Sequence, residues 1–327
     1  MPTELAKETM EMTWKEQTGR QSGQILLEGD MIVPDSQPDL KEILRCTGKV
    51  HIGDKRINDE RIGFSGELEV TVLYTPKNGE RSLYTMKATL PLEDFIHIDG
   101  LGKDAEVTLE TELEHLDCEI INDRKIGVKA VIGVNAMAEQ ERSMEIVCDA
   151  EGDGVECLRG TLQMETDVAE VKDRFTVKEE LVLPSAKPQI GEMLWEGIAL
   201  TEHDVRPMDG KVMIRGNLKI SVLYTDGQEG HLGSYTERIP FSGYLEGEGI
   251  DPHAVMDAEL WLEDAKVTPM VDEDGETRQL AVDVTVGARL KAREAVEKEI
   301  LMDAYVPGQK MELQREMIVY PVTVANG

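Results

Sequence analysis

The chain has 327 residues, of which 40% are hydrophobic, so its length and apolar content favour about two or three folded domains over a disordered segment. Its net charge of -30 would repel nucleic acid and anionic membrane surfaces. The N-terminal residues lack the basic and apolar run of a signal peptide, and no window approaches the roughly 20 apolar residues of a membrane span, so we expect a soluble, cytoplasmic chain.

The first predicted element is an opening segment around Thr9 to Thr13. Similar segments occur around Leu162 to Thr166 and around Leu313 to Val319. No module follows the third segment in the sequence. Two interpretations stay open: the segment closes the preceding module as an added strand, or it begins a further copy in a longer protein, which we favour.

A short helix is predicted after Pro38, because proline suits the first helical position and apolar residues follow at helical spacing. The same pattern follows Pro188. The apolar positions are Leu40, Ile43 and Leu44 in the first case and Ile190, Met193 and Leu194 in the second. We expect each helix to plug one end of a sheet or barrel.

The strongest strand signal is the run GELEVTVLYT at Gly66 to Thr75, which recurs as GNLKISVLYT at Gly216 to Thr225. Alternation in both runs predicts strands with one core face and one wet face. The predicted core face carries Leu68, Val70, Val72 and Tyr74 in one run and Leu218, Ile220, Val222 and Tyr224 in the other. On the solvent-facing side of the strand the side chains stay polar in both copies, but the charge reverses from Glu69 to Lys219.

A second alternating run follows a turn-like stretch in each copy, at 121–124 and at 272–276, so we expect a hairpin there that is longer in the second copy. Its predicted core positions are Ile126, Val128, Ala130 and Ile132, and Leu280, Val282, Val284 and Val286.

Matches at nearly constant offset show that the whole unit is duplicated. The segment from Val33, VPDSQPDLKEIL, aligns with LPSAKPQIGEML from Leu183. The segment from Glu145, EIVCDA, aligns with EILMDA from Glu299. We predict a mainly β protein of two tandem homologous β-sandwich or partly open barrel modules, each with one short helix. The first spans 1–158 and the second 159–310, and 311–327 is the closing strand or the start of a truncated third copy.

No residue is assigned as catalytic, cofactor-binding or metal-binding. The six histidines have no histidine counterparts in the other copy: His51 aligns with Thr201 and His97 with Glu246. Asp272 to Glu276 has the acidic side chains of a calcium loop, but its glycine comes too early for an EF-hand, so we interpret it as a solvated hairpin tip. Residues 151–154 form a connecting loop, and Gly247 and Gly249 do not precede a helical pattern as a phosphate loop would require.

The four cysteines lack zinc-like spacing and fit a reducing cytosol. Cys148 aligns with Met302 and Cys157 with Met311, so buried apolar packing is the expected role; the other two are Cys46 and Cys118.

Partner-binding residues are not assigned, but tandem β modules commonly bind through sheet edges or shallow faces. Trp195 and Trp261 occur only in the second copy. We expect a core role for Trp195, and either ring could anchor a partner if it is exposed.

The VPD strand end, the PDLKEIL run, the G-x-L-x-V-x-VLY strand and the LP or IPF turn resemble the SPOCS domain of clostridial sporulation proteins such as SipL. The resemblance covers nearly the whole chain in both copies. It implies a structural role in building the spore envelope, on the mother-cell side of the forespore, with spore coat morphogenetic proteins as partners. SipL-type proteins carry a LysM domain that contacts the coat morphogenetic ATPase, and no LysM-like segment is recognised here, so the resemblance implies the general role and leaves this particular contact open. No catalytic residue transfers from the family.

The favoured function is therefore a non-enzymatic scaffold of spore coat assembly that acts through protein–protein interaction and needs no cofactor. The alternative is a carbohydrate-binding or cell-wall-binding tandem β module, against which the aromatic content of only 4% and the missing export signal argue. An enzyme with an unrecognised site is the third hypothesis.

Overall fold

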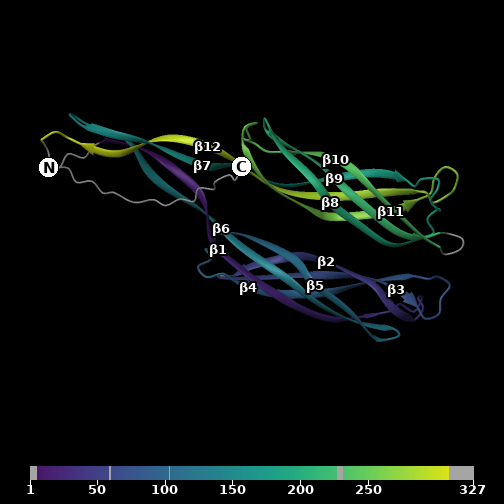
Figure 1. The fold of residues 1–327 in the computed structure, drawn as a ribbon. Coiled ribbons are helices and arrows are strands. Elements are labelled where there is room, and N and C mark those ends of the chain that lie inside the picture. Colours follow the sequence, from purple (N-terminus) through teal and green to yellow (C-terminus); the bar gives the residue numbers. More distant parts are fainter. Residues whose placement is uncertain (1–5, 59, 103, 227–230, 309–327) are drawn as a thin grey trace.

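The computed structural model describes residues 6–58, 60–102, 104–226 and 231–308, and within these ranges the protein contains antiparallel strands and no helix (Figure 1). The strands of the first half are β1 (Ala6–Ile32), β2 (Leu40–Asn58), β3 (Arg61–Pro76), β4 (Tyr84–His97), β5 (Glu106–Asn122) and β6 (Lys125–Glu151). Those of the second half are β7 (Glu156–Val182), β8 (Glu192–Met208), β9 (Lys211–Thr225), β10 (Leu232–Glu246), β11 (Val255–Met270) and β12 (Gln279–Tyr305).

Each half is a sandwich of two three-stranded sheets. In the first module the sheet β1-β6-β5 packs on the sheet β2-β3-β4, and in the second β7-β12-β11 packs on β8-β9-β10. The expected core faces are confirmed, since all sixteen of the alternating apolar residues named above are buried. The central strands β3 and β6 therefore supply the middle of the first core, and β9 and β12 supply the middle of the second.

The expected hairpins are also confirmed. Strands β5 and β6 are joined through Asp123 and Arg124, whereas β11 and β12 are joined by the longer stretch from Val271 to Arg278. Residues 311–327, interpreted as a closing strand or a third copy, lie outside the described residues.

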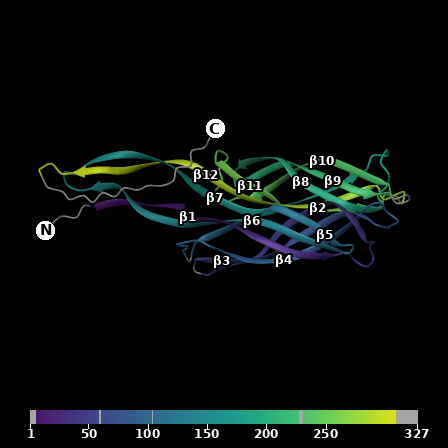
Figure 2. The same ribbon diagram turned by 60° about the horizontal axis from the view of Figure 1, so that its bottom comes forward.

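Two strands of each module run on beyond the sandwich as a two-stranded arm. In the first arm Ala6–Glu16 of β1 pairs with the end of β6 from Gln140 onward, where β5 no longer reaches. In the second arm the start of β7 pairs with the end of β12. Figures 1 and 2 show both arms leaving the sandwiches at the same end of the molecule, which makes the protein elongated.

The predicted helices after Pro38 and Pro188 are wrong, because these residues lead into β2 and β8. Two β-bulges, at Leu40/Glu42 and at Ile43/Arg45, each add a residue to β2, so positions three apart come to share a face. Leu40, Ile43 and Cys46 accordingly pack into the core, while Leu44 is exposed. A bulged strand thus produced the spacing that resembled a helix.

A proline-containing loop before β2 closes one end of the first sandwich. The buried Tyr74 hydroxyl donates a hydrogen bond to the Pro38 carbonyl at 3.1 Å and to Gln37 Oε1 at 3.2 Å. From the facing hairpin, the Arg124 guanidinium donates to the Val33 and Pro34 carbonyls at 3.1 and 3.0 Å. The loop therefore ties the two sheets together.

The second module repeats this arrangement. Tyr224 donates to the Pro188 carbonyl at 3.1 Å, and Arg278 donates to the Pro184 and Lys187 carbonyls at 3.0 and 2.8 Å. The shared prolines and the VLY strand end of the two copies thus serve one structural purpose, which is to close the sandwich end.

Alkaline pH should weaken the first module through Tyr74. Burial, followed by the neighbouring Tyr84, raises the pKa of Tyr74 to about 12, above the value of about 10 for an unfolded chain. This contribution to stability is complete below pH 10 and is lost as the pH rises through 12, at no more than about 1.4 kcal/mol per pH unit. Denaturant titrations between pH 9 and 12 should show a shallower pH slope for Tyr74→Phe, although Tyr235, whose pKa is also raised to about 12, keeps its share. An unchanged slope would contradict the assignment.

Gly66, matched by Gly216 in the second copy, should tolerate no side chain. A Cβ there would lie inside van der Waals distance of the His51 carbonyl oxygen on β2, where the backbone is irregular. We expect Gly66→Ala to lower the free energy of unfolding by about 1–3 kcal/mol. Gly53→Ala is the matched control, because its Cβ would meet the Ser65 carbonyl at an ordinary 3.6 Å, and equal losses for the two variants would refute this reading.

Candidate functional site

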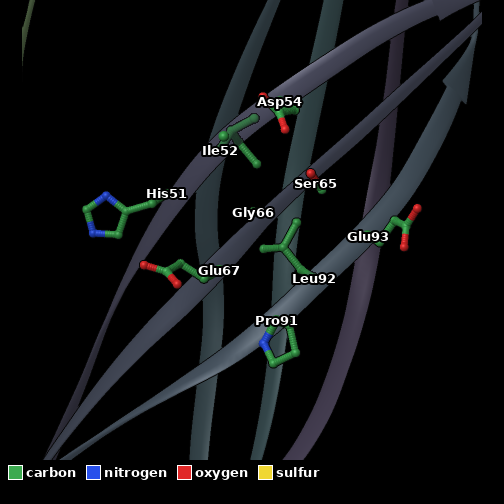
Figure 3. A pocket seen from close by; sticks show the side chains of 10 residues that line it. His51, Ile52, Asp54, Ser65, Gly66, Glu67, Pro91, Leu92 and Glu93 are labelled. Carbon is green, nitrogen blue, oxygen red and sulfur yellow. The ribbon is translucent and has the colours of Figure 1, made fainter.

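A shallow, open hollow of about 670 Å³ lies on the sheet β2-β3-β4 of the first module (Figure 3). Its polar side chains include His51 and Asp54 of β2, Ser65 and Glu67 of β3 and Glu93 of β4. Figure 3 shows His51 and Glu93 pointing away on opposite flanks, so they do not converge on one point. The hollow offers a surface for shallow contact rather than a reaction centre.

One histidine lies beside two carboxylates. His97 Nε2 is 3.0 Å from Asp99 Oδ1 and 3.6 Å from Glu60 Oε2, and all three side chains are exposed. These groups could hold a metal ion, although exposed acidic groups of this kind are common without one. The sequence comparison of the copies passed over this group because Glu246 aligns with His97.

In the acidic hairpin tip at 272–276, the Asp272 carboxylate stabilises the turn by accepting backbone hydrogen bonds. Asp272 Oδ1 accepts hydrogen bonds from the backbone N–H groups of Asp274 and Glu276, at 3.0 and 2.9 Å. That bonding accounts for Asp272 without a cation. Residues 152–155 connect β6 to β7, with Gly154 at φ +73°.

All four cysteines are free and half-buried, so the buried apolar packing expected of Cys148 and Cys157 is only partial. Both lie in the two-stranded arms, where Cys157 Sγ donates to the Ala150 carbonyl at 3.3 Å. Cys46 and Cys118 lie at the margin of the first core.

The one charged side chain that is buried in the described part of the chain joins the two modules. Arg289 of β12 is 7% exposed; its Nε donates to Glu170 Oε1 of β7 at 2.9 Å and its Nη1 donates to Thr108 Oγ1 of β5 at 2.9 Å. Its Nη2 lies 3.5 Å from Glu139 Oε2 of β6. Thr108 and Glu139 belong to the first module, so one guanidinium bridges both.

Two lysines extend this group, which we call the interface ion cluster: Lys15, Glu106, Thr108, Glu139, Glu170, Arg289 and Lys291. Lys291 donates to both Glu139 carboxylate oxygens at 3.1 Å. Lys15 of β1 forms ion pairs with Glu106 and Glu170. Burial alone would raise the pKa of Glu170, but hydrogen bonds from Lys15 and Arg289 hold it below its ordinary value.

An apolar contact joins the modules at a second place. Leu73 and Leu83 of the first module pack with Leu194 and Leu223 of the second, and Thr85 donates a hydrogen bond to the Leu194 carbonyl. Beside this leucine cluster, the Arg45 guanidinium lies 4.7 Å from the centre of the Trp195 ring. Trp195 therefore serves the module interface, whereas the sequence suggested a core role.

Trp261 is 38% exposed on the sheet β7-β12-β11, and its indole covers the backbone of Gly287. It is the tryptophan that a partner could reach from solvent, as the sequence allowed. Its nearest polar neighbours along β11 include Glu263, which pairs with Arg174 at 2.8 Å.

Comparison with protein families decides the identity of the modules. The family described as SipL, SPOCS domain, matches residues 39–121 and 189–270, about half of the chain. This chain belongs to the SPOCS domain family. Searches of curated proteins and of solved structures found no match.

The family match covers β2 to β5 and β8 to β11. The central strands β6 and β12, and their partners β1 and β7, lie outside it, although the SPOCS cores need them. The interface ion cluster belongs largely to these flanking strands. In the part of the chain that the structure describes, no helix has the length and apolar character needed to cross a lipid bilayer.

Removing the central cation should separate the modules. Arg289→Ala would leave Glu139 and Glu170 partly buried with fewer partners, and breaking such a pair costs about 3–5 kcal/mol when it is buried. We expect a larger radius of gyration by small-angle X-ray scattering and faster proteolysis at residues 152–155. Arg174→Ala, which breaks the exposed pair with Glu263, should leave both measurements unchanged. Identical scattering from all three proteins would show that Arg289 does not hold the modules together.

Proposed function

We propose that this chain is a non-enzymatic scaffold of spore coat assembly that acts through protein–protein contacts. The observation that carries the proposal is membership of both modules in the SPOCS family, which connects the chain with spore coat morphogenesis. The two interface contacts support a scaffold, because they hold the modules side by side as one extended unit.

The surface chemistry supports binding rather than catalysis. His51 and Glu93, which border the hollow on the sheet β2-β3-β4, point away from each other, and the charged groups of the interface ion cluster are paired with one another. A catalytic site usually presents perturbed acids or bases to an accessible cleft. The net charge of -30 favours partners with basic surfaces.

The proposed place of action is the cytoplasm on the mother-cell side of the forespore, and the proposed partners are other coat morphogenetic proteins. The coat morphogenetic ATPase, bound through LysM in SipL-type relatives, is one candidate. Here the SPOCS modules themselves would supply the contact.

An affinity pull-down with the tagged chain from sporulating mother-cell lysate, read by mass spectrometry, tests this function. We expect enrichment of coat proteins over a lysate from vegetative cells. The Arg174→Ala variant is the matched control for surface charge and should recover the same proteins. If no coat protein is enriched and a deletion strain makes normal spores, the proposed scaffold role is wrong.

Trp261 favours one second candidate, a carbohydrate-binding module, because an exposed ring on a sheet face can stack on a sugar. Cosedimentation with purified peptidoglycan that is lost in Trp261→Ala would support that function in place of the scaffold.

A further inference from the structure

Two thiols meet between the facing sheets of the first module. Cys46 lies on β2 and Cys118 on β5, and Cys46 is close enough to contribute to the raised pKa of the Cys118 thiol. Both pack against the same core cluster, and Cys46 Sγ is also 4.0 Å from the Leu116 carbonyl oxygen on β5. The two sulfur atoms are therefore neighbours across the sandwich although they are far apart in sequence.

The second module ties its sheets at the same point with different chemistry. Cys46 lies opposite Val72 in the strand register, and Glu196 lies opposite Val222, which is the counterpart of Val72 in the second copy. Glu196 is therefore the counterpart of Cys46. In the same way, Cys118 lies opposite Val128, and Val267 lies opposite Val282, which is the counterpart of Val128. Val267 is therefore the counterpart of Cys118. In the second module the Glu196 carboxylate accepts a hydrogen bond from the Val267 backbone N–H at 3.0 Å.

This position lies where the sandwich lacks main-chain hydrogen bonds. Strands β2 and β5 are edge strands of different sheets, as are β8 and β11. Side-chain ties between the two edges therefore resist their separation. In the second module the hydrogen bond between Val267 and Glu196 joins the two edge strands, and the first module has a pair of thiols at the same position.

We propose that Cys46 and Cys118 are a modification site that forms a disulfide and locks the two sheets of the first module together. The oxidant is a small-molecule disulfide of the glutathione class. One thiolate attacks it and releases one reduced thiol; the second cysteine then attacks the mixed disulfide and releases another. The protein loses two protons and two electrons, and one oxidant disulfide becomes two thiols.

The surroundings of Cys118 make this reaction slow at neutral pH. Burial, followed by the neighbouring Cys46, raises the pKa of the Cys118 thiol far above its ordinary value, and the attacking species is the thiolate. Thiol–disulfide exchange at this pair is therefore slow at neutral pH. The pair reacts faster as the pH rises or when the sheets open.

Incubation of the purified full chain with oxidised glutathione at pH 7 and pH 9, followed by non-reducing peptide mapping, tests the site. We expect a Cys46–Cys118 cross-link that forms at least several-fold faster at pH 9. Closing a loop of about 70 residues should raise the melting temperature of the first module by roughly 5–10 °C, reversibly with dithiothreitol.

Matched variants separate this site from general thiol oxidation. Cys118→Val copies the residue at the equivalent position of the second module, so it should fold and lose both the cross-link and the thermal shift. Cys148→Ser should keep both. A product that contains only glutathione adducts, or a cross-link only between Cys148 and Cys157, would overturn the proposal. So would a cross-link that leaves the melting temperature unchanged.

Discussion

A guanidinium group removed from water needs charged or polar partners, and Arg289 takes them from both modules, although its Nη2 makes no hydrogen bond and has only the ion-pair contact with Glu139. Its partners are Glu170 from its own module and Thr108 and Glu139 from the other. Desolvating such an ion costs several kcal/mol unless good geometry compensates, so other placements of the modules would leave charges buried and unpaired. The relative arrangement of the two SPOCS modules depends on this constraint, and the scaffold role depends on that arrangement.

The leucine cluster adds a second restraint away from the first. The ion cluster lies near Phe64 of β3, because Lys55, the strand partner of Phe64, donates a hydrogen bond to the Val107 carbonyl next to Thr108. The leucine cluster includes Leu73 of the same strand. Nine residues of an extended strand separate these two points by roughly 30 Å. Two contacts so far apart oppose a hinge motion better than either alone. Ion pairs supply orientation at one, and apolar burial supplies attraction at the other.

Period-two alternation was enough to predict the central strands from sequence, because β3, β6, β9 and β12 each bury one face. It failed at Leu40 to Leu44, since bulges shift the period and a local pattern cannot reveal them. The ion cluster was missed for a related reason. Arg289 and Lys291 lie on the face of β12 that looks solvated in a single module, and docking of the other module covers them. A reversal of charge between the copies, as at Glu69 and Lys219, is a sequence signal that can indicate a solvent-facing strand face that differs in role between the modules.

The most direct test of a locked two-module scaffold is the distribution of distances between one spin label on each module, attached at exposed positions through unnatural amino acids so that the four thiols stay untouched. Pulsed electron resonance of the wild-type chain should give one narrow distribution at low and at physiological salt. A broad or multimodal distribution would show that the SPOCS modules move independently, which contradicts the account.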